Sequence, residues 1–523
     1  MPESRPTTTT DFAIGVLLYL RYPIPEFLGP ALREMGVTYV AAHHTNYRDM
    51  SPAAVLKRVR AYRDFCEANR LKFRILIAYS EFPDAVFREA AKSAYFEGVQ
   101  MQEAPWGKII RGDQRKNPHI RPFARLKPAM SLPEALAAVE AGVVAERKRY
   151  ERLGSRVVTT NVFPVMFHAL ARGGMDVCPK FMKESFTPVA HANAWGAALQ
   201  YGVDLWADGD LWFHGRRPGH GADELLASLL YAYWTGASRF LVEGAGGSAL
   251  DSTAPSFKMA RGSWVDLDGL ISLDGTTWKL NRRGEVLREF TRDYFPGHPR
   301  PFTFRDVEPD IAVVRFPDAQ CGMDWGRMRW RERAFGCAGS PATPPESHHW
   351  PRVWNLLTHG ASGRDMTFFS RKGGPFFFFP LNGVVVFDHR VGCDRLRGVP
   401  LIVLTGAEVS DETRAAVARC VAEGATCVAS PNLTPPDVLE DGRPGAAPIV
   451  VVRGKGRWVV TPDFREDPLQ PLLRGLIGTK DRIRYRFRGG RTVTFRMVDG
   501  NPNGVVVEMA GGPGCASTGN VSP

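Results

Sequence analysis

The feature that most constrains this chain is a repeated alternation between short apolar runs and amphipathic helical patterns across residues 12–243. Such units build a parallel sheet, because each buried strand needs a crossover, usually a helix, before the next strand can pair with it. Eight units within about 250 residues are typical of a (β/α)8 TIM barrel, and we predict that residues 11–300 form this α/β fold. The predicted strands are residues 12–19, 37–42, 73–79, 98–103, 157–165, 176–181, 203–207 and 239–243.

A different pattern begins after the barrel region. A helix predicted over residues 278–295 closes the barrel, and a Pro-rich stretch follows it. Buried strands and one helix then indicate a flavodoxin-like α/β domain over residues 301–445. Short strands dominate residues 446–511, where the stretch from Arg488 to Gly490 predicts a β-hairpin. We therefore predict a barrel, a second α/β domain and a small C-terminal β domain.

Composition and short motifs limit the partners and ligands that we expect for this chain. The formal net charge is +12, but the basic residues are scattered, so we expect no nucleic-acid partner. None of the eight cysteines lies in a C-x-x-C pair, and the cluster from His348 to Trp350 lacks ligand spacing, so we expect no metal and no cofactor. The N-terminus lacks a signal-peptide pattern, and there is no apolar run of about 18 residues. We therefore expect a cytoplasmic protein without a membrane partner.

Two carboxylates stand where predicted strands end. Phe240–Gly247 reads FLVEGAGG, an apolar run that stops at Glu243 and continues into glycine. Gly98–Glu103 reads GVQMQE and follows the same pattern, a strand-like run that ends at Glu103. Barrel enzymes carry their chemistry at the carboxyl ends of the strands, so we predict that both glutamates are catalytic. Other candidates for substrate binding at or beyond strand ends are His43, His44, Asn46, Gln102, Asn161, Glu184, Trp206, Asp208 and Trp212.

Some of these candidates have a structural explanation as well. An ion pair with Lys183 would explain Glu184, and a turn around Gly209 would explain both Asp208 and Asp210. The two histidines after the second strand could line a pocket or lie in the core. No polar signature follows the strands of residues 301–445, so we expect this domain to contribute packing or homo-oligomer contacts but no catalytic group.

The domain order resembles that of family 42 type β-galactosidases and related glycoside hydrolases, and this resemblance implies that residues 301–445 form a glutamine-amidotransferase-like domain. The segments that carry the likeness are LNRRGEVLREFTRDYF, DIAVVRF and VPLIVLTGAEVSDETRAAVARCVAEGATCV. In the clan that includes this family, the acid/base Glu follows strand 4, usually as Asn-Glu, and the nucleophile follows strand 7. The resemblance implies a carbohydrate substrate, with Glu103 as acid/base and Glu243 as nucleophile. Here Gln102 occupies the Asn position, and Glu243 ends the eighth predicted strand.

Cleavage of a glycosidic bond explains the need for two carboxylates. One acid protonates the leaving oxygen, and a second carboxylate attacks the anomeric carbon or activates water. The apolar stretch from Ala104 to Trp106 suggests a raised pKa for Glu103, and the glycines after Glu243 suggest an ionised carboxylate there.

Two alternatives remain open at the level of sequence. One is a catalytically silent carbohydrate-binding or scaffold protein, which the missing Asn before Glu103 would fit. The other is a non-hydrolytic barrel enzyme, such as a lyase or isomerase, which a metal cluster or a phosphate-binding loop would favour.

Overall fold

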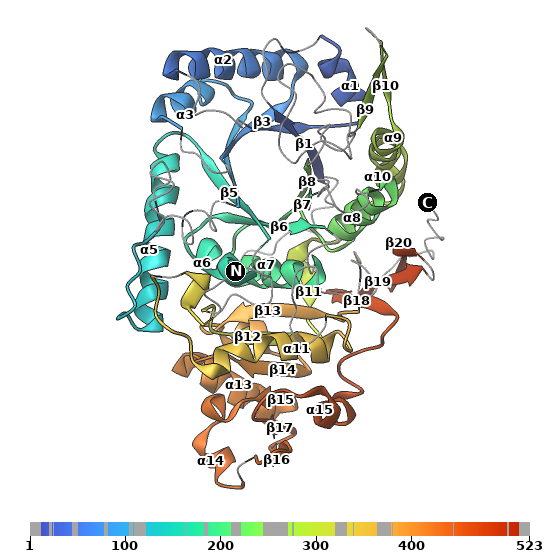
Figure 1. Cartoon of the computed structure of the whole chain (residues 1–523). Helices are drawn as coiled ribbons and strands as arrows, with labels where there is room; N and C mark the ends of the chain where they lie inside the picture. Colours follow the sequence, from blue (N-terminus) through green and yellow to red (C-terminus); the bar gives the residue numbers. More distant parts are fainter. Residues whose placement is uncertain are drawn as a thin grey trace, which may run out of the picture.

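The structure of the protein is a computed structural model (Figure 1). Its described residues are 12–19, 26–43, 51–77, 82–103, 122–162, 164–182, 187–210, 221–243, 270–274, 277–318, 332–337, 339–362, 380–442, 444–498 and 501–511, together with Ile24, Lys108 and Phe378.

Eight parallel strands close into a barrel in which each strand pairs with the next and β1 pairs with β8. This confirms the TIM barrel predicted from the sequence. The strands are β1 (Ala13–Tyr19), β2 (Tyr39–His43), β3 (Lys72–Ile77), β4 (Phe96–Gln102), β5 (Arg156–Asn161), β6 (Asp176–Phe181), β7 (Trp206–Asp210) and β8 (Arg239–Glu243). The connecting helices are α1 (Leu28–Glu34), α2 (Pro52–Asn69), α3 (Asp84–Ala90), α5 (Leu132–Glu151), α6 (Phe167–Arg172), α7 (Thr187–Tyr201) and α8 (Ala222–Trp234).

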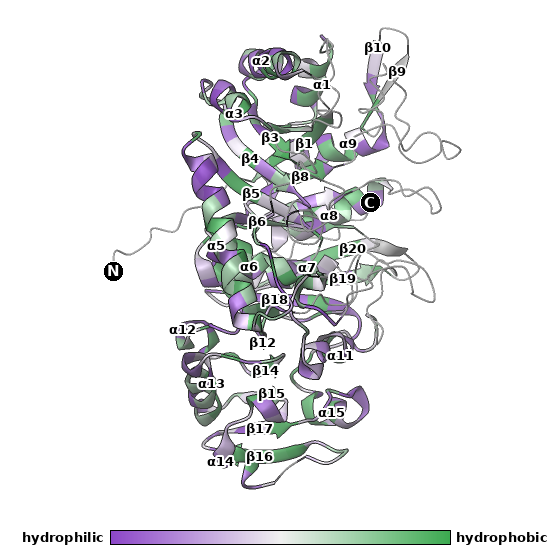
Figure 2. Cartoon of the chain, turned by 60° about the vertical axis from the view of Figure 1, so that its left-hand side comes forward, coloured by the Kyte–Doolittle hydropathy of each residue, from purple (hydrophilic) through white to green (hydrophobic). Residues whose placement is uncertain are grey.

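The longest helices begin where their sequences provide caps. The Ser51 side chain accepts a hydrogen bond from the backbone of Ala54, and Pro52 fills the first helical position of α2. Ser131 and Glu134 form a reciprocal capping box at the start of α5. Both helices carry hydrophilic and hydrophobic residues in Figure 2, as expected when only one face packs on the barrel.

Most predicted strand ends shift by one or two residues, and three elements differ more. Strand β5 ends at Asn161, and a 3-10 helix (Pro164–Met166) takes the place of the predicted strand end. Strand β7 starts at Trp206 and ends at Asp210, three residues later than predicted at each end. The predicted helix 278–295 begins instead as strand β10 (Thr277–Leu280), which pairs with β9 (Ile271–Asp274). Asn281 caps the helix that follows, α9 (Arg282–Glu289), which leads through a π-helix (Phe290–Tyr294) into α10 (Phe295–Gly297).

The barrel interior is filled by side chains, so it is a core rather than a channel. Its middle contains Leu17, Ala41, Leu76, Val158, Cys178 and Leu241, all of them buried. Near the amino ends of the strands, the guanidinium group of Arg74 lies 4.1 Å from the centre of the Trp206 ring. The opposite end of the barrel, formed by the carboxyl ends of the strands, carries the polar residues described below.

The second domain is a six-stranded sheet in the order β13-β12-β14-β15-β17-β16. Its strands are β12 (Ile311–Arg315), β13 (Val384–Asp388), β14 (Leu401–Thr405), β15 (Thr426–Ala429), β16 (Ile449–Arg453) and β17 (Gly456–Val460). The five parallel strands follow the flavodoxin-like order 2-1-3-4-5, and β16 adds an antiparallel edge. The sheet therefore continues past the boundary expected at residue 445. Its helices are α11 (Trp350–Leu357), α12 (Cys393–Leu396), α13 (Asp411–Glu423), α14 (Pro436–Leu439) and α15 (Glu466–Leu473).

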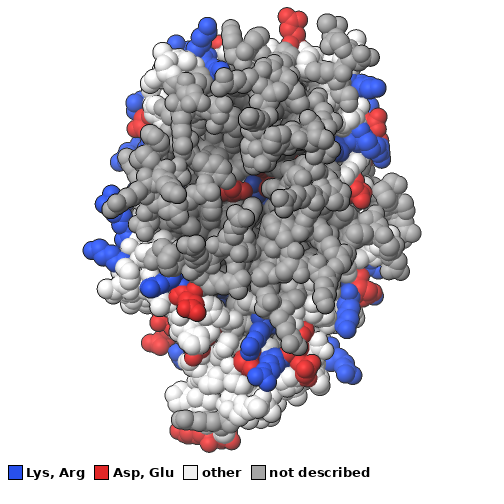
Figure 3. Space-filling model, viewed as in Figure 1, with Lys and Arg blue, Asp and Glu red and all other residues white. Residues whose placement is uncertain are grey.

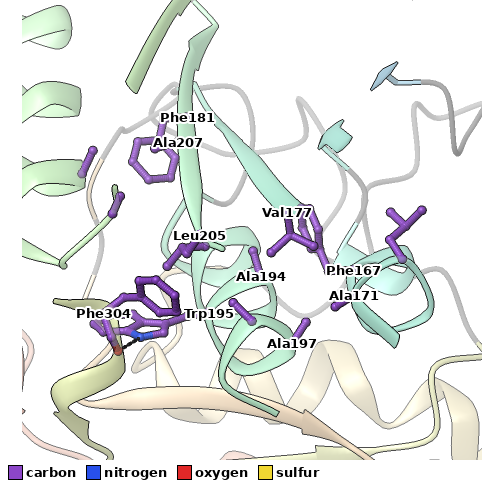
Figure 4. Close-up of a cluster of buried hydrophobic side chains, with 14 of the residues drawn as sticks. Phe167, Ala171, Val177, Phe181, Ala194, Trp195, Ala197, Leu205, Ala207 and Phe304 are labelled. Carbon is purple, nitrogen blue, oxygen red and sulfur yellow. Dashed lines mark hydrogen bonds between the residues drawn. The ribbon is translucent and has the colours of Figure 1, made fainter. Parts of the chain in front are cut away.

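Helix α7 lies between the barrel and the second sheet (Figure 1). Thirteen of its fifteen residues are buried, which explains why its sequence is apolar and rich in alanine on all sides. Figure 4 shows Ala194, Trp195 and Ala197 of this helix close to Val177 and Leu205 of the barrel, with the Trp195 indole donating to the Phe304 carbonyl. At Gly196 the helix approaches β13 so closely that a Cβ atom would lie 1.6 Å from the Val386 carbonyl oxygen.

The C-terminal strands form a four-stranded antiparallel sheet in the order β11-β18-β19-β20. They are β11 (Val307–Glu308), β18 (Arg482–Phe487), β19 (Arg491–Val498) and β20 (Asn501–Ala510). The predicted hairpin is present, with positive φ at both Gly489 and Gly490. The sheet packs on α8 and α7, where the buried hydroxyl groups of Tyr231 and Tyr485 lie 2.9 Å apart. Among the described helices, none is long and apolar enough to cross a membrane.

Candidate active site

The candidate site lies where β4, β6, β7 and β8 end. Strand pairing places Lys180 of β6 beside Asp208 of β7, and Asp210 of β7 beside Glu243 of β8. Side chains alternate along a strand, so Lys180 faces the barrel interior like Cys178, and Glu243 faces it like Leu241. The pleat therefore brings charged side chains from three strands into one layer above the apolar core.

Lys180 is the centre of this layer. Its Nζ atom lies 2.9 Å from Glu103 Oε1, 2.9 Å from Asp210 Oδ2 and 3.0 Å from Glu243 Oε2. The lysine side chain is 2% exposed, whereas that of Glu103 is 21% exposed. A buried lysine with three carboxylate partners is well compensated, since an ammonium group has three N–H donors and no acceptor.

Glu103 reaches the centre because the backbone turns there. By simple alternation it would face away from Gln102, toward the helical layer. Its φ is instead 48°, a left-handed value that residues other than glycine rarely adopt. The Glu103 amide still donates to the Thr160 carbonyl at 2.8 Å, so the residue extends the pairing of β4 with β5 while its side chain turns inward. Strained backbone of this kind is concentrated at functional sites.

Amide side chains support the carboxylates. The Gln102 side-chain amide donates to Glu243 Oε1 across the barrel. One layer below, the Gln100 amide donates to the Thr160 hydroxyl at 2.8 Å. Both glutamines are buried, and each links β4 to another strand. Gln102 thus orients Glu243 by a hydrogen bond from β4.

The two predicted catalytic carboxylates lie close together. Glu103 Oε1 and Glu243 Oε2 contact the same nitrogen, so they are at most about 6 Å apart, compared with about 5–5.5 Å between the carboxyl groups of retaining glycosidases and about 6.5–9.5 Å in inverting ones.

Burial and charge shift the protonation equilibria of this layer. Burial raises the pKa of Glu243 to about 7, and the negative charge of Asp210 adds to the effect, while Lys180 opposes it. Burial and the charge of Glu243 raise the pKa of Asp208 well above its usual range. Burial acts to lower the pKa of Lys180, but Asp210, Glu103 and Glu243 outweigh it and raise that pKa. The layer therefore holds both a protonated carboxyl group and a permanent cation near neutral pH.

The structure brings four of the predicted site residues together: Gln102, Glu103, Asp208 and Glu243. His43 is the last residue of β2, in register with Tyr19. Asn161 ends β5 and is buried, but by alternation it faces away from the interior side occupied by Thr160. His44, Asn46, Glu184 and Trp212 lie outside the described residues.

Trp206 was predicted at the end of a strand, and this placement is wrong. It is the first residue of β7, about 13 Å along the strand from Asp210. Its buried ring contacts the guanidinium groups of Arg74 and Arg239, and its indole nitrogen donates to Asp204. Trp206 thus belongs to the floor of the barrel.

Sequence reasoning missed Lys180, and it left Asp210 out of the predicted site because a turn around Gly209 would also explain that residue. Each carries a signal in its strand, because Lys180 lies two residues after the inward-facing Cys178, and Asp210 lies two residues after Asp208. A charge on the inward face at the end of a barrel strand is a functional signal. Figure 3 shows Asp or Glu atoms and Lys or Arg atoms near the centre of the face seen in Figure 1.

Within the described part of the chain, no group of three or more His, Cys, Asp or Glu side chains could hold a metal ion. The six described cysteines are all free thiols.

No protein-family model matches the chain, and no curated protein matches its sequence. Solved structures align with it at low identity. The exo-β-1,4-mannosidase Op5Man5 from Opitutaceae bacterium strain TAV5 aligns with a TM-score of 0.49 and 11% identity, over 90% of this chain and 97% of that one. The deoxyribose phosphate aldolase from Aeropyrum pernix aligns with a TM-score of 0.27 and 15% identity, over 45% of this chain and 86% of that one.

Proposed function

We propose that this protein is a glycoside hydrolase that uses Glu103 and Glu243 as its catalytic pair and retains the configuration of the anomeric carbon. The observation that carries the proposal is the placement of both carboxylates on one lysine, at most about 6 Å apart, at the carboxyl mouth of the barrel. A smaller separation favours direct attack by a carboxylate, because the inverting arrangement must leave room for a water molecule.

The raised pKa of Glu243 reverses the roles expected from the sequence. A general acid works best when its pKa is near the operating pH, and Glu243 has a pKa of about 7. We therefore assign Glu243 as the general acid/base and Glu103 as the nucleophile. Glu103 is also the more exposed of the two side chains, as suits a group that must contact the anomeric carbon.

The proposed reaction has two steps. In the first, Glu243 donates its proton to the glycosidic oxygen as the bond to the anomeric carbon breaks, and a Glu103 oxygen forms an ester with that carbon. In the second, the Glu243 carboxylate takes a proton from water, the water oxygen attacks the anomeric carbon, and the ester bond to Glu103 breaks. Each residue then returns to its starting state.

One observation keeps a second function in view. Lys180 binds both carboxylates, and such neutralisation is also what a catalytically silent carbohydrate-binding protein on this fold would show. In a silent protein the pair would serve only to anchor the barrel mouth.

A panel of aryl glycosides that vary in sugar, anomer and leaving group separates the two functions. We expect turnover of at least one sugar, a loss of at least about a thousandfold for Glu103→Gln, and a loss of about a hundredfold to ten-thousandfold for Glu243→Gln with poor leaving groups. Activated leaving groups should largely escape the second loss, because they need no proton.

The matched control is Glu146→Gln, which alters a buried, ion-paired glutamate on α5 outside the site. Binding of sugars without turnover of any glycoside would establish the silent protein instead.

A further inference from the structure

The layer around Glu243 contains more negative than positive groups. Among the described residues, Glu103, Asp208, Asp210 and Glu243 supply four carboxyl groups, and Lys180 is the cation that contacts three of them. Carboxylates this close repel one another, and burial strengthens the repulsion. Without a cation, such a site would hold its carboxyl groups protonated or spread them apart.

The contacts of Lys180 fix the positions of these carboxyl groups. Its three N–H donors match three carboxylates that come from three different strands. All three contacts fall between 2.9 and 3.0 Å, and the lysine is fully enclosed. A lysine whose donors are all engaged by anions is held protonated, so it is a poor nucleophile for carbonyl carbons. Its chemistry is that of a fixed positive charge.

We propose that Lys180 is a positioning residue that holds the nucleophile and the acid of the proposed hydrolase in one layer and sets the pH range in which they work. This inference rests on the function proposed above for its catalytic meaning, but its electrostatic part can be tested without any substrate. Among the residues that the structure describes, the titratable groups that act on this layer are Tyr39 of β2, Cys178 and Lys180 of β6, Asp208 and Asp210 of β7, Glu103 after β4 and Glu243 of β8.

The direction of the effect follows from charge. A nearby cation favours the ionised form of a carboxyl group, so removal of the cation raises the pKa of that group. In Lys180→Met we expect the pKa of Glu243 to rise by about 1–3 units. Both limbs of the activity profile should move to higher pH, because the nucleophile and the acid lose the same neighbour.

The test compares four proteins: wild type, Lys180→Met, Lys180→Arg and Lys108→Met. Lys108 is a matched control, because it is also buried and pairs with Glu146 at 2.9 Å, but it lies outside the site. The pKa of Glu243 is measured by infrared or carbon-13 titration with labelled glutamate, assigned through Glu243→Gln. We expect a raised pKa in Lys180→Met, near recovery in Lys180→Arg, and the wild-type value in Lys108→Met.

An unchanged pKa of Glu243 in folded Lys180→Met would overturn the proposal. If Lys180→Met does not fold, the double variant Lys180→Met/Asp210→Asn is used to test the proposal instead. It removes one charge of each sign, and we expect it to fold with a pKa of Glu243 close to that of wild type. A double variant that stays unfolded would show that the lysine acts only in stability. Absence of glycoside turnover by wild type would contradict the proposed function, whereas the titration would still report on Lys180.

Discussion

At Glu103 a single backbone angle decides which way a carboxylate points. The φ of 48° costs about 1–3 kcal/mol for a residue with a side chain, and it turns Glu103 from the helical layer toward Lys180. Gln102, its neighbour, faces the same centre by ordinary alternation. The side chains of two consecutive residues therefore both point into the site, whereas in a regular strand they would point to opposite faces.

The role of Glu243 can be read from the pH dependence of kcat/KM in wild type. A general acid must hold its proton in the free enzyme, so we expect activity to fall as pH rises through about 7, the pKa of Glu243. This limb should be absent in Glu243→Gln when a substrate with an activated leaving group is used. A rise in activity through the same range would show instead that Glu243 acts in its ionised form, as a nucleophile does.

At the scale of elements, the sequence predicts most strands because they contain an apolar run, although β7, with the sequence WADGD, does not. All eight barrel strands were anticipated, and Glu103 and Glu243 were recognised because each interrupts such a run at its end. Lys180 was missed although the predicted strand 176–181 has the observed bounds and contains it, because only residues at or beyond the strand ends were considered as site candidates. Trp206 was misplaced because the start of β7 was set three residues too early.

The pKa values of the site could not be predicted from sequence. These pKa values depend on which side chains meet across the barrel. The groups that act on Glu243 are Gln102, Lys180 and Asp210, which lie far apart in the chain. Only the closed barrel brings these residues together.

Helix α7 offers a test of close packing between the barrel and the second sheet. In Gly196→Ala the new Cβ atom would meet the Val386 carbonyl oxygen at 1.6 Å, so helix and strand must separate. We expect the free energy of unfolding in urea to fall by at least about 1–3 kcal/mol, the usual cost of overpacking. Gly297→Ala is the control, since nothing lies within 4 Å of its Cβ position. Equal stability of both variants would contradict the close approach of α7 to β13.

At the scale of the whole molecule, the barrel and the two following sheets share one continuous hydrophobic core. Helix α7 packs on β13, and α8 packs on the C-terminal sheet, so the later domains cover the side of the barrel formed by these helices. The C-terminal strands thus stabilise the helices that follow β6 and β7, the strands that carry Lys180 and Asp210.

A double-mutant cycle on the hydroxyl groups of Tyr231 and Tyr485 measures the coupling between the barrel and the C-terminal sheet. Both hydroxyls are buried and bond to each other at 2.9 Å. Tyr485→Phe or Tyr231→Phe alone should cost about 1–3 kcal/mol of unfolding free energy, because the remaining hydroxyl loses its partner. The double variant should cost clearly less than the sum of the two. Strictly additive losses in this double-mutant cycle would show that the two hydroxyls do not interact.

The most direct test of the catalytic pair is to trap the glycosyl-enzyme. An aryl 2-deoxy-2-fluoro glycoside of whichever sugar the wild type cleaves should form the ester quickly and hydrolyse it slowly, and peptide mass spectrometry then locates the label. We expect one sugar per chain, attached to Glu103, with no label in Glu103→Gln. A label on Glu243 would reverse the two roles, and hydrolysis with inversion and no covalent label would contradict the retaining pair inferred from the distance between Glu103 and Glu243.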